Sequence, residues 1–98
     1  MNSCNFVGRI FDQKPTLTKE NGANVVRFFV EVVESRKDAS GVRKKIFTVL
    51  GFEAWDTGAE AICANCDVGD QIALETNARY DQDHEEIYFR VKTFKVFK

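Results

Sequence analysis

Apolar and polar residues alternate along most of the chain, and this period of two predicts β-strands. The first alternating run, SCNFVGRIF, covers residues 3–11, and a long β-rich run, NVVRFFVEVVESRK, covers residues 24–37. A third run, VRKKIFTVLGFEAW, covers residues 42–55, and two more follow at residues 71–80 and 85–97. The pattern therefore predicts five strands.

Glycine, proline and polar clusters separate these runs. The stretch KPTLTKENGAN contains Pro15 and the pair Asn21-Gly22, so it is predicted to be a loop or a hairpin connection. Three shorter links, DASG, DVGD and DQDHE, are predicted to be turns.

One short helix is predicted from about Thr57 to Asn65. Thr57 and Glu60 have the spacing of a capping box, and Asp56 favours the positive end of the helix dipole. Residues at helical spacing form one apolar stripe, made of Ala59, Ile62, Cys63 and Cys66. So short a helix is expected to cover the end of a larger structure.

The order of these elements is three strands, a helix and two strands, which is the layout of an oligonucleotide-binding (OB) fold. We therefore predict a mainly β protein: a five-stranded OB-fold barrel with one short helix between strands 3 and 4. The 98 residues suffice for a single domain, residues 1–98. Such a barrel typically binds its ligand on strands 2 and 3.

Alternation also assigns side chains to the two faces of each strand. On the second strand, the inward set is Val26, Phe28, Val30 and Val32, and the outward set is Val25, Arg27, Phe29, Glu31 and Val33. On the third strand, the inward set is Ile46, Thr48, Leu50, Phe52 and Ala54, and the outward set is Phe47, Val49, Gly51, Glu53 and Trp55. On the last strand, the inward set is Ile87, Phe89 and Val91, and the outward set is Tyr88, Arg90 and Lys92. A bulge is expected after Thr93.

Outward aromatic and basic side chains together are the combination that binds single-stranded nucleic acid, by base stacking and phosphate neutralisation. The candidate binding residues are Arg9, Arg27, Phe29, Arg36, Lys37, Arg43, Lys44, Lys45, Phe47, Trp55, Arg79, Tyr80, Tyr88 and Arg90. The alternative for the aromatics is burial in the core or at a subunit interface. Five of the candidate residues lie in a predicted basic hairpin, ESRKDASGVRKK at residues 34–45, for which the alternative is a solvated turn. Trp55, the only tryptophan, is either a core anchor or an outer-face platform, and strand phase favours the platform.

Charge is distributed unevenly along the chain, although the net charge is only −1. Residues 1–52 hold nine Lys or Arg against five acids, and residues 53–86 hold one Arg against ten acids. Residues 87–98 hold four basic residues and no acid. This segregation predicts one basic and one acidic face.

The sequence offers little for metal or catalytic chemistry. Cys63 and Cys66 have CxxC spacing, but they lack a second ligand pair, and the only histidine, His84, lies in an acidic turn. We therefore expect no metal, no cofactor, no small-molecule substrate and no enzymatic activity. No apolar run reaches eighteen residues and no signal-like N-terminus is present, so a cytoplasmic protein with no membrane partner is expected.

The chain resembles the DNA-binding domain of bacterial and phage single-stranded DNA-binding proteins over nearly its whole length. The similar motifs are NFVGRI, NGANVVRFFVEVVESRK, FEAWDTGAEAI and VGDQIALETNARY, in that order. The resemblance implies single-stranded DNA binding without sequence specificity, in replication, recombination or repair. It places Trp55 at the stacking aromatic before the helix. Phe29 and Phe47 match the family's other stacking aromatics approximately, by face, and Tyr80 is a substitute for the aromatic usually found near the hairpin between strands four and five, which is shorter here. Arg36 and Lys37 stand where the family often has a tryptophan.

The resemblance further implies self-association as a dimer or tetramer, with Asn5 and Val7 of the first strand at the interface. Cellular members usually end in a flexible linker and an acidic tip, whereas this sequence ends at KVFK. A compact form, from a phage or plasmid, is the favoured explanation, and a truncated chain is the other. The alternative function is that of a primosomal replication protein B-like or RNA-binding OB-fold protein.

Overall fold

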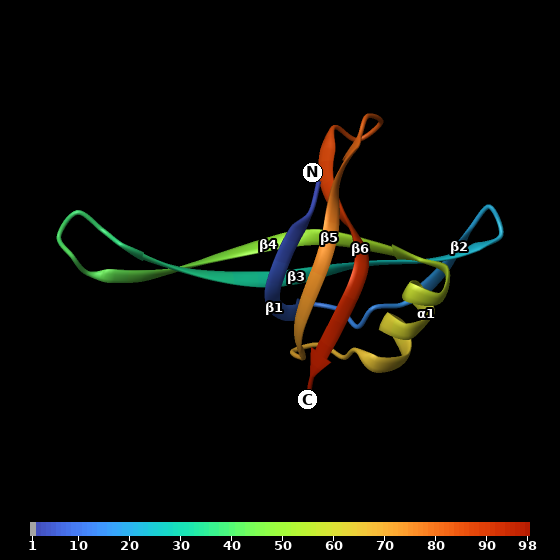
Figure 1. The fold of residues 1–98 in the computed structure, drawn as a ribbon, viewed down its shortest axis with the longest axis horizontal. Helices are drawn as coiled ribbons and strands as arrows, with labels where there is room; N and C mark the ends of the chain where they lie inside the picture. Colours follow the sequence, from blue (N-terminus) through green and yellow to red (C-terminus); the bar gives the residue numbers. More distant parts are fainter. Residues whose placement is uncertain (1) are drawn as a thin grey trace.

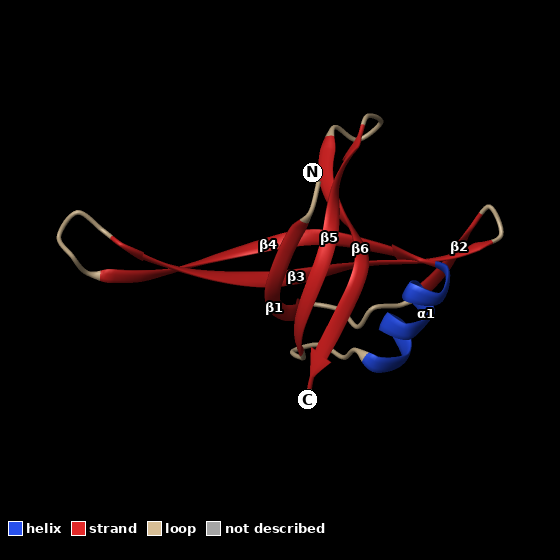
Figure 2. Ribbon diagram, viewed as in Figure 1, coloured by secondary structure: helices blue, strands red, loops and turns tan. Residues whose placement is uncertain are grey.

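The computed structural model describes residues 2–98, which form six strands and one helix (Figure 2). The elements, in chain order, are β1 (Cys4–Phe11), β2 (Leu17–Glu20), β3 (Ala23–Lys37), β4 (Arg43–Trp55), α1 (Asp56–Asn65), β5 (Gln71–Asp81) and β6 (Glu86–Phe97). None of the helices in the described part of the chain is both long and apolar enough to cross a membrane.

Five of the strands close into a ring. They are hydrogen-bonded in the order β1-β5-β6-β4-β3, and β3 pairs again with β1 through Arg9↔Glu31, Ile10↔Val30 and Phe11↔Phe29. This ring, with α1 between the third and fourth of its strands, confirms the predicted OB-fold barrel. The sixth strand, β2, is a short addition that was predicted only as a loop or hairpin connection. Asn21 and Gly22 both have positive φ, as a two-residue hairpin turn requires.

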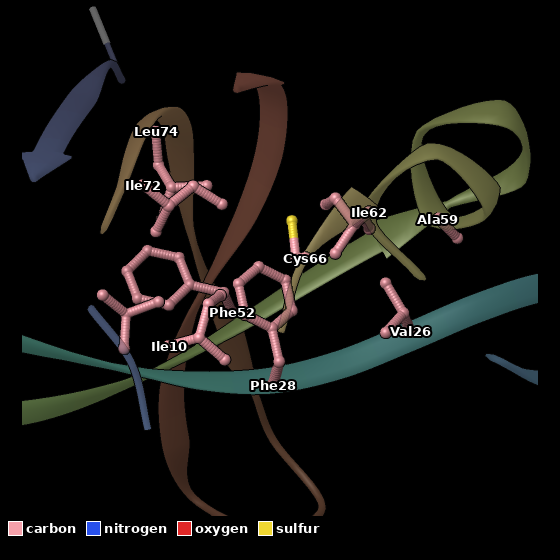
Figure 3. Packing of buried hydrophobic residues seen from close by; sticks show 11 residues of the cluster. Ile10, Val26, Phe28, Phe52, Ala59, Ile62, Cys66, Ile72 and Leu74 are labelled. Atoms are coloured by element: carbon pink, nitrogen blue, oxygen red, sulfur yellow. The ribbon is translucent and has the colours of Figure 1, made fainter. Parts of the chain in front are cut away.

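The core lies inside the ring and beneath the helix (Figure 3). Phe28 and Phe52, partners across β3 and β4, stack with their ring centroids 5.7 Å apart, and Phe6 meets the edge of Phe52 at 5.4 Å. The other buried members are Ile10, Val26, Val30, Ala54, Ala59, Ile62, Cys66, Ile72 and Leu74. The inward positions predicted for the middle of the second and third strands are therefore confirmed.

The helix α1 covers one end of the ring (Figures 1 and 3). Ala59 and Ile62 form its buried face, Cys66 is buried directly after its last residue, and Cys63, the fourth member of the predicted stripe, is partly buried. The predicted capping box of α1 is wrong. The helix begins at Asp56, its N-cap residue is Trp55, and no side chain caps it. Thr57 is thus already inside the helix, whereas a capping side chain must come from the residue before it. Glu60 accepts a hydrogen bond from Nδ2 of Asn24 instead, at 2.7 Å.

The β3–β4 and β5–β6 hairpins extend beyond the ring, and they explain most of the errors in the predicted faces (Figure 1). The outer parts of β3 and β4 have no core beneath them, so Ile46 and Thr48 are exposed instead of buried. Ile87, predicted to point inward, is 67% exposed near the tip of the β5–β6 hairpin. Alternation identifies the face of a residue but not where the barrel ends.

Two further corrections concern the ends of the alternating pattern. Val25 was predicted to face outward but is fully buried, because β3 is flanked there by Thr18 of β2 and Trp55 of β4. The bulge in the last strand falls at Lys92, since Glu75 pairs with Thr93 and the next residue of β5 pairs with Val91. It therefore lies one residue before the predicted position.

Candidate nucleic-acid interface

The outer face of the β3–β4 hairpin carries a row of exposed apolar and aromatic side chains. Phe29 is 54% exposed and Phe47 is 58% exposed, and both lie on the face predicted for them. Phe47 pairs across the hairpin with Val33, which is also exposed. An exposed apolar strip on a strand pair is a feature that a binding partner can cover.

Phe29 is the centre of this face. It pairs with Gly51, and a Cβ atom at Gly51 would lie 3.7 Å from Cε1 of Phe29, so the ring rests over the bare glycine backbone. Two hollows flank the ring: one of about 270 Å³ toward β6, and one of about 210 Å³ toward Phe11 of β1. Phe28, Phe29 and Arg27 line both hollows. The exposed ring therefore stands between two adjoining depressions.

The larger hollow, called the Trp55 pocket below, brings together five of the predicted binding residues. They are Arg27, Phe29, Trp55, Tyr88 and Arg90. These residues come from β3, β4 and β6, so the pocket depends on the closed ring. Trp55 is half-buried here: it is neither a core anchor nor a fully displayed platform.

A buried carboxylate organises the Trp55 pocket. Glu53 is only 5% exposed although it lies on the outward face of β4. Its Oε1 accepts a hydrogen bond from Nε1 of Trp55 at 2.6 Å and one from Nη2 of Arg90 at 3.1 Å. Its Oε2 accepts from Nε of Arg27 at 3.1 Å. The guanidinium of Arg90 also lies 5.6 Å from the centroid of the Trp55 ring, within cation–π range.

Arg27 is held from a second side as well. Its Nη1 and Nη2 donate to the two carboxylate oxygens of Glu20 at 2.8 and 3.0 Å, a bidentate arrangement. The hydrogen bond from Arg27 lowers the pKa of Glu20, and Glu20 in turn raises the pKa of Arg27. Both partners are thus charged at neutral pH, and the positive charge of Arg27 already faces two carboxylates.

The basic hairpin predicted for residues 34–45 forms the far end of β3 and the start of β4 (Figure 1, left). Its five basic residues are Arg36, Lys37, Arg43, Lys44 and Lys45, all exposed. Arg36 and Lys44 have only long contacts, 3.6 Å to Glu34 and 3.7 Å to Asp38, while Arg43 donates to the hydroxyl of Ser35 at 3.2 Å. Within residues 2–98, no ion pair involves Lys37 or Lys45.

The turn of this hairpin is held by one carboxylate. Oδ1 of Asp38 accepts hydrogen bonds from the backbone N–H groups of Ser40 and Val42 and from the Ser40 hydroxyl. These bonds, with that from the Ser40 hydroxyl the largest cause, lower the pKa of Asp38. Gly41 supplies the positive φ that the turn needs. The turn therefore fixes the register that pairs the basic residues across the two strands.

The β5–β6 hairpin forms the rim of the Trp55 pocket. Tyr88 lines the pocket and pairs with Arg79, while Tyr80 is exposed opposite Ile87 farther out. Asp81 and Glu86 also line the pocket, so this rim is acidic. Arg79 and Tyr80 thus lie beside the pocket and not inside it.

Three predicted residues lie away from this surface. Arg9, on β1, donates from Nη1 to the carbonyl of Gly69 at 2.9 Å and does not line the Trp55 pocket. Asn5 and Val7, predicted at an oligomer interface, lie on a part of β1 that pairs with β5 but not with β3. That side of the strand is therefore a free sheet edge within the described chain.

Three residues of the site were not predicted as such. Gly51 and Glu53 were placed on the outward face without a role, and Phe11, which lines the smaller hollow, was not placed at all. A signal for Glu53 existed in the sequence: counting outward from the DASG turn pairs Arg27 with Glu53. Opposite charges on facing positions indicate a cross-strand ion pair.

His84 and the three cysteines do not line the Trp55 pocket. His84 and Asp81 contact each other at 2.8 Å in the β5–β6 turn, where Asp81 also accepts from two backbone N–H groups. All three cysteines are free thiols, and burial raises the pKa of Cys66 to about 11. Among the described residues, no three metal-binding side chains come together.

Comparisons with known proteins agree with this architecture. The single-strand binding protein family matches residues 1–96 of the sequence. No curated protein sequence matches the chain. Solved structures with the same fold include the single-stranded DNA-binding protein from Thermus aquaticus, with a TM-score of 0.85 and 15% identity over 100% of this chain and 50% of that one.

Two shorter proteins are also similar in structure. The small single-stranded DNA-binding protein from Streptomyces coelicolor has a TM-score of 0.78 and 14% identity over 97% of this chain and 92% of that one. The second single-stranded DNA-binding protein from Mycobacterium smegmatis has a TM-score of 0.77 and 14% identity over 97% and 87%. The chain thus spans half of the Thermus aquaticus protein and most of the small ones. With the family match over residues 1–96, the chain belongs to the single-strand binding protein family.

Proposed function

We propose that this protein binds single-stranded DNA on the outer face of the β3–β4 hairpin and in the adjoining Trp55 pocket. Family membership supports the nucleic-acid class, and the exposed ring of Phe29 over Gly51, between two hollows, is the observation that carries the proposal. A flat, exposed aromatic surface suits an unstacked base, which double-stranded DNA does not offer.

Stacking supplies the sequence-tolerant part of the binding. Phe29, Phe47, Tyr88 and the free portion of Trp55 present aromatic surface along β3, β4 and β6. Because every base has a π-face, such contacts hold any base, at about 1–3 kcal/mol per stacked base. We therefore propose binding that is largely independent of sequence.

Phosphate contacts come from the basic hairpin. Residues 34–45 hold five basic residues against two acids, and their ion pairs are long or absent in the described chain. Some acidic residues elsewhere have closer partners within the protein: Lys14 lies 3.1 Å from Asp67, and Lys98 lies 3.2 Å from Asp70. Although the net charge of the protein is −1, the hairpin of residues 34–45 is positively charged and is available to contact a DNA backbone.

A protein that coats single strands in this way protects them while replication, recombination or repair proceeds, and this is the cellular role we propose. It calls for no catalytic group. We also propose that the free edge of β1 at Asn5 and Val7 pairs with a second copy of the chain, because an exposed strand edge of this kind is suited to strand addition. Light scattering at micromolar concentration tests this: a monomer contradicts it.

A competition experiment tests the proposed function. Labelled oligo-dT is displaced by unlabelled single-stranded DNA, duplex DNA or RNA of equal length. The proposal predicts that single-stranded DNA competes best and that duplex DNA competes weakly. Better competition by RNA would support the RNA-binding alternative, and equal competition by duplex would contradict base stacking.

A further inference from the structure

The network around Glu53 commits the two arginines of the Trp55 pocket to partners inside the protein. Glu53 forms ion pairs with both Arg27 and Arg90, at 3.0 and 3.1 Å. Arg27 forms a second ion pair with Glu20, which is more exposed than Glu53. Two positive charges thus meet two negative charges. In the basic hairpin, by contrast, no partner charge lies within ion-pair distance of Lys37 or Lys45 in residues 2–98.

A carboxylate as buried as Glu53 needs several partners to offset the loss of its hydration. Its two oxygens receive the indole N–H and both guanidinium groups, which are charge-assisted hydrogen bonds. Drawing Arg27 or Arg90 away toward a DNA phosphate would leave this carboxylate short of a partner. The arrangement therefore opposes phosphate binding by these arginines.

The same network fixes the tryptophan. The bond from Nε1 to Glu53 sets the direction of the indole, and Arg90 lies over its ring at 5.6 Å. One face of the ring is thus occupied by a cation, and the rest of the ring lines the hollow that Phe29 and Tyr88 complete. An acidic rim, formed by Asp81 and Glu86, further disfavours a phosphate at this place.

We infer that Glu53 is a positioning residue of the DNA-binding surface: it orients Trp55 and retains Arg27 and Arg90 as pocket walls, so that the Trp55 pocket receives a base and not a phosphate. This inference rests on the proposed function, and it assigns phosphate neutralisation to the hairpin. It reverses the roles of Arg27 and Arg90 predicted from the sequence.

The salt dependence of oligo-dT binding tests the assignment of the charges. For single strands, the slope of log K against log salt changes by about 0.7 for each phosphate contact. Lys45→Gln is expected to make the slope about 0.7 shallower, whereas Arg90→Gln and Arg27→Gln leave it unchanged. Glu53→Gln frees Arg90 from its carboxylate, whereas Arg27 keeps its bidentate pair with Glu20, so the slope is expected to become steeper by about 0.7. The inference is overturned if Arg27→Gln or Arg90→Gln makes the slope of log K against log salt as shallow as Lys45→Gln does.

The emission of Trp55, the only tryptophan, tests its positioning in the free protein. Glu53→Gln keeps an oxygen that accepts the indole N–H, so its emission maximum and acrylamide quenching should match those of the wild type. Glu53→Ala lacks that acceptor, so a red shift and stronger quenching are expected. Circular dichroism shows whether each variant is folded, and the Arg90→Gln salt slope decides the charge question if Glu53→Ala unfolds.

These outcomes separate the inference from the proposed function. If the wild type binds no oligo-dT at any salt concentration, the proposed function and the charge assignment both fall. The fluorescence of the free protein still decides the positioning of Trp55: unchanged emission in a folded Glu53→Ala variant would overturn it.

Discussion

The ring of Phe29 on β3 lies across Gly51 on β4, with Cε1 of the ring 3.7 Å from the position a Cβ atom would take at Gly51. A Cβ atom at residue 51 would thus be in ordinary van der Waals contact with the edge of the ring. The ring packs beside the glycine while Phe29 stays 54% exposed, which leaves aromatic surface for a base.

Removing the Phe29 ring should lower the affinity for DNA while leaving the free energy of unfolding almost unchanged. Phe29→Ala is expected to weaken oligo-dT binding by about 1–3 kcal/mol, because one stacking surface is lost. The side chain is 54% exposed, so the free energy of unfolding should change by about 0.5 kcal/mol or less. Fluorescence titration with labelled DNA and urea denaturation measure the two quantities. Phe97→Ala, which removes an exposed ring outside both hollows, is the matched control, and equal loss of affinity in both variants would count against the stacking site.

A pair of glycine substitutions tests how the barrel closes. A Cβ atom at Gly8 would overlap the carbonyl oxygen of Glu31 and lie 2.7 Å from Cγ1 of Val30, so β1 and β3 must separate to admit it. Gly8→Ala should therefore destabilise the protein by about 1–3 kcal/mol, the range for overpacking. Gly58 of α1 has nothing within 4 Å of the same position, and Gly58→Ala should stabilise by about 0.5–1 kcal/mol. Thermal unfolding of both variants checks this; a stable Gly8→Ala protein would show that β1 is not held against β3 as described.

His84 gives the turn of the β5–β6 hairpin a pH dependence of predictable sign. The hydrogen bond and charge of Asp81 raise the pKa of His84 above 6.5, and the hydrogen bond from the His84 side chain lowers the pKa of Asp81 below 3.8. The histidine contribution to stability is thus complete below pH 6.5 and is lost as pH rises through the raised value. The aspartate contribution is complete above pH 3.8 and is lost as pH falls.

An NMR titration of the only histidine measures the first of these shifts directly. The ring should titrate above pH 6.5 in the wild type, and Asp81→Asn should return it toward that value. Glu86→Gln is the control, since Glu86 acts on His84 only through charge and is a lesser cause of the raised pKa. A titration unaffected by Asp81→Asn would mean that the turn is not closed by this pair.

Much of the fold is encoded in alternation that can be read directly. Phe28 and Phe52 are both apolar residues in phase with their neighbours, and both lie in the core as predicted. Ile87 and Ile46 follow the same alternation but are exposed, because a strand that runs past the barrel has no core beneath it. Local pattern cannot supply the length of the barrel, which is a property of all five strands together.

The sequence predicts which aromatic and basic residues face outward, but not which of the basic residues are paired inside the protein and which are free. Phe29 and Phe47 were identified from strand phase alone, and both are exposed. Arg27 and Arg90 have the same phase, yet their charges face Glu53, a residue that outward phase would make solvent-exposed. Which cations remain free depends on contacts between β3, β4 and β6, and no single stretch of sequence contains those contacts.

The most direct test of the account is a titration of the wild-type protein with oligo-dT, followed by Trp55 emission at two salt concentrations. We predict that Trp55 emission is quenched on binding and that the affinity for oligo-dT falls as the salt concentration rises. Binding of labelled oligo-dT by Trp55→Ala, run beside it, should be weaker by about 1–3 kcal/mol. Unchanged Trp55 emission, or an affinity independent of salt, would contradict the central claim that this face binds single-stranded DNA by stacking and phosphate contacts.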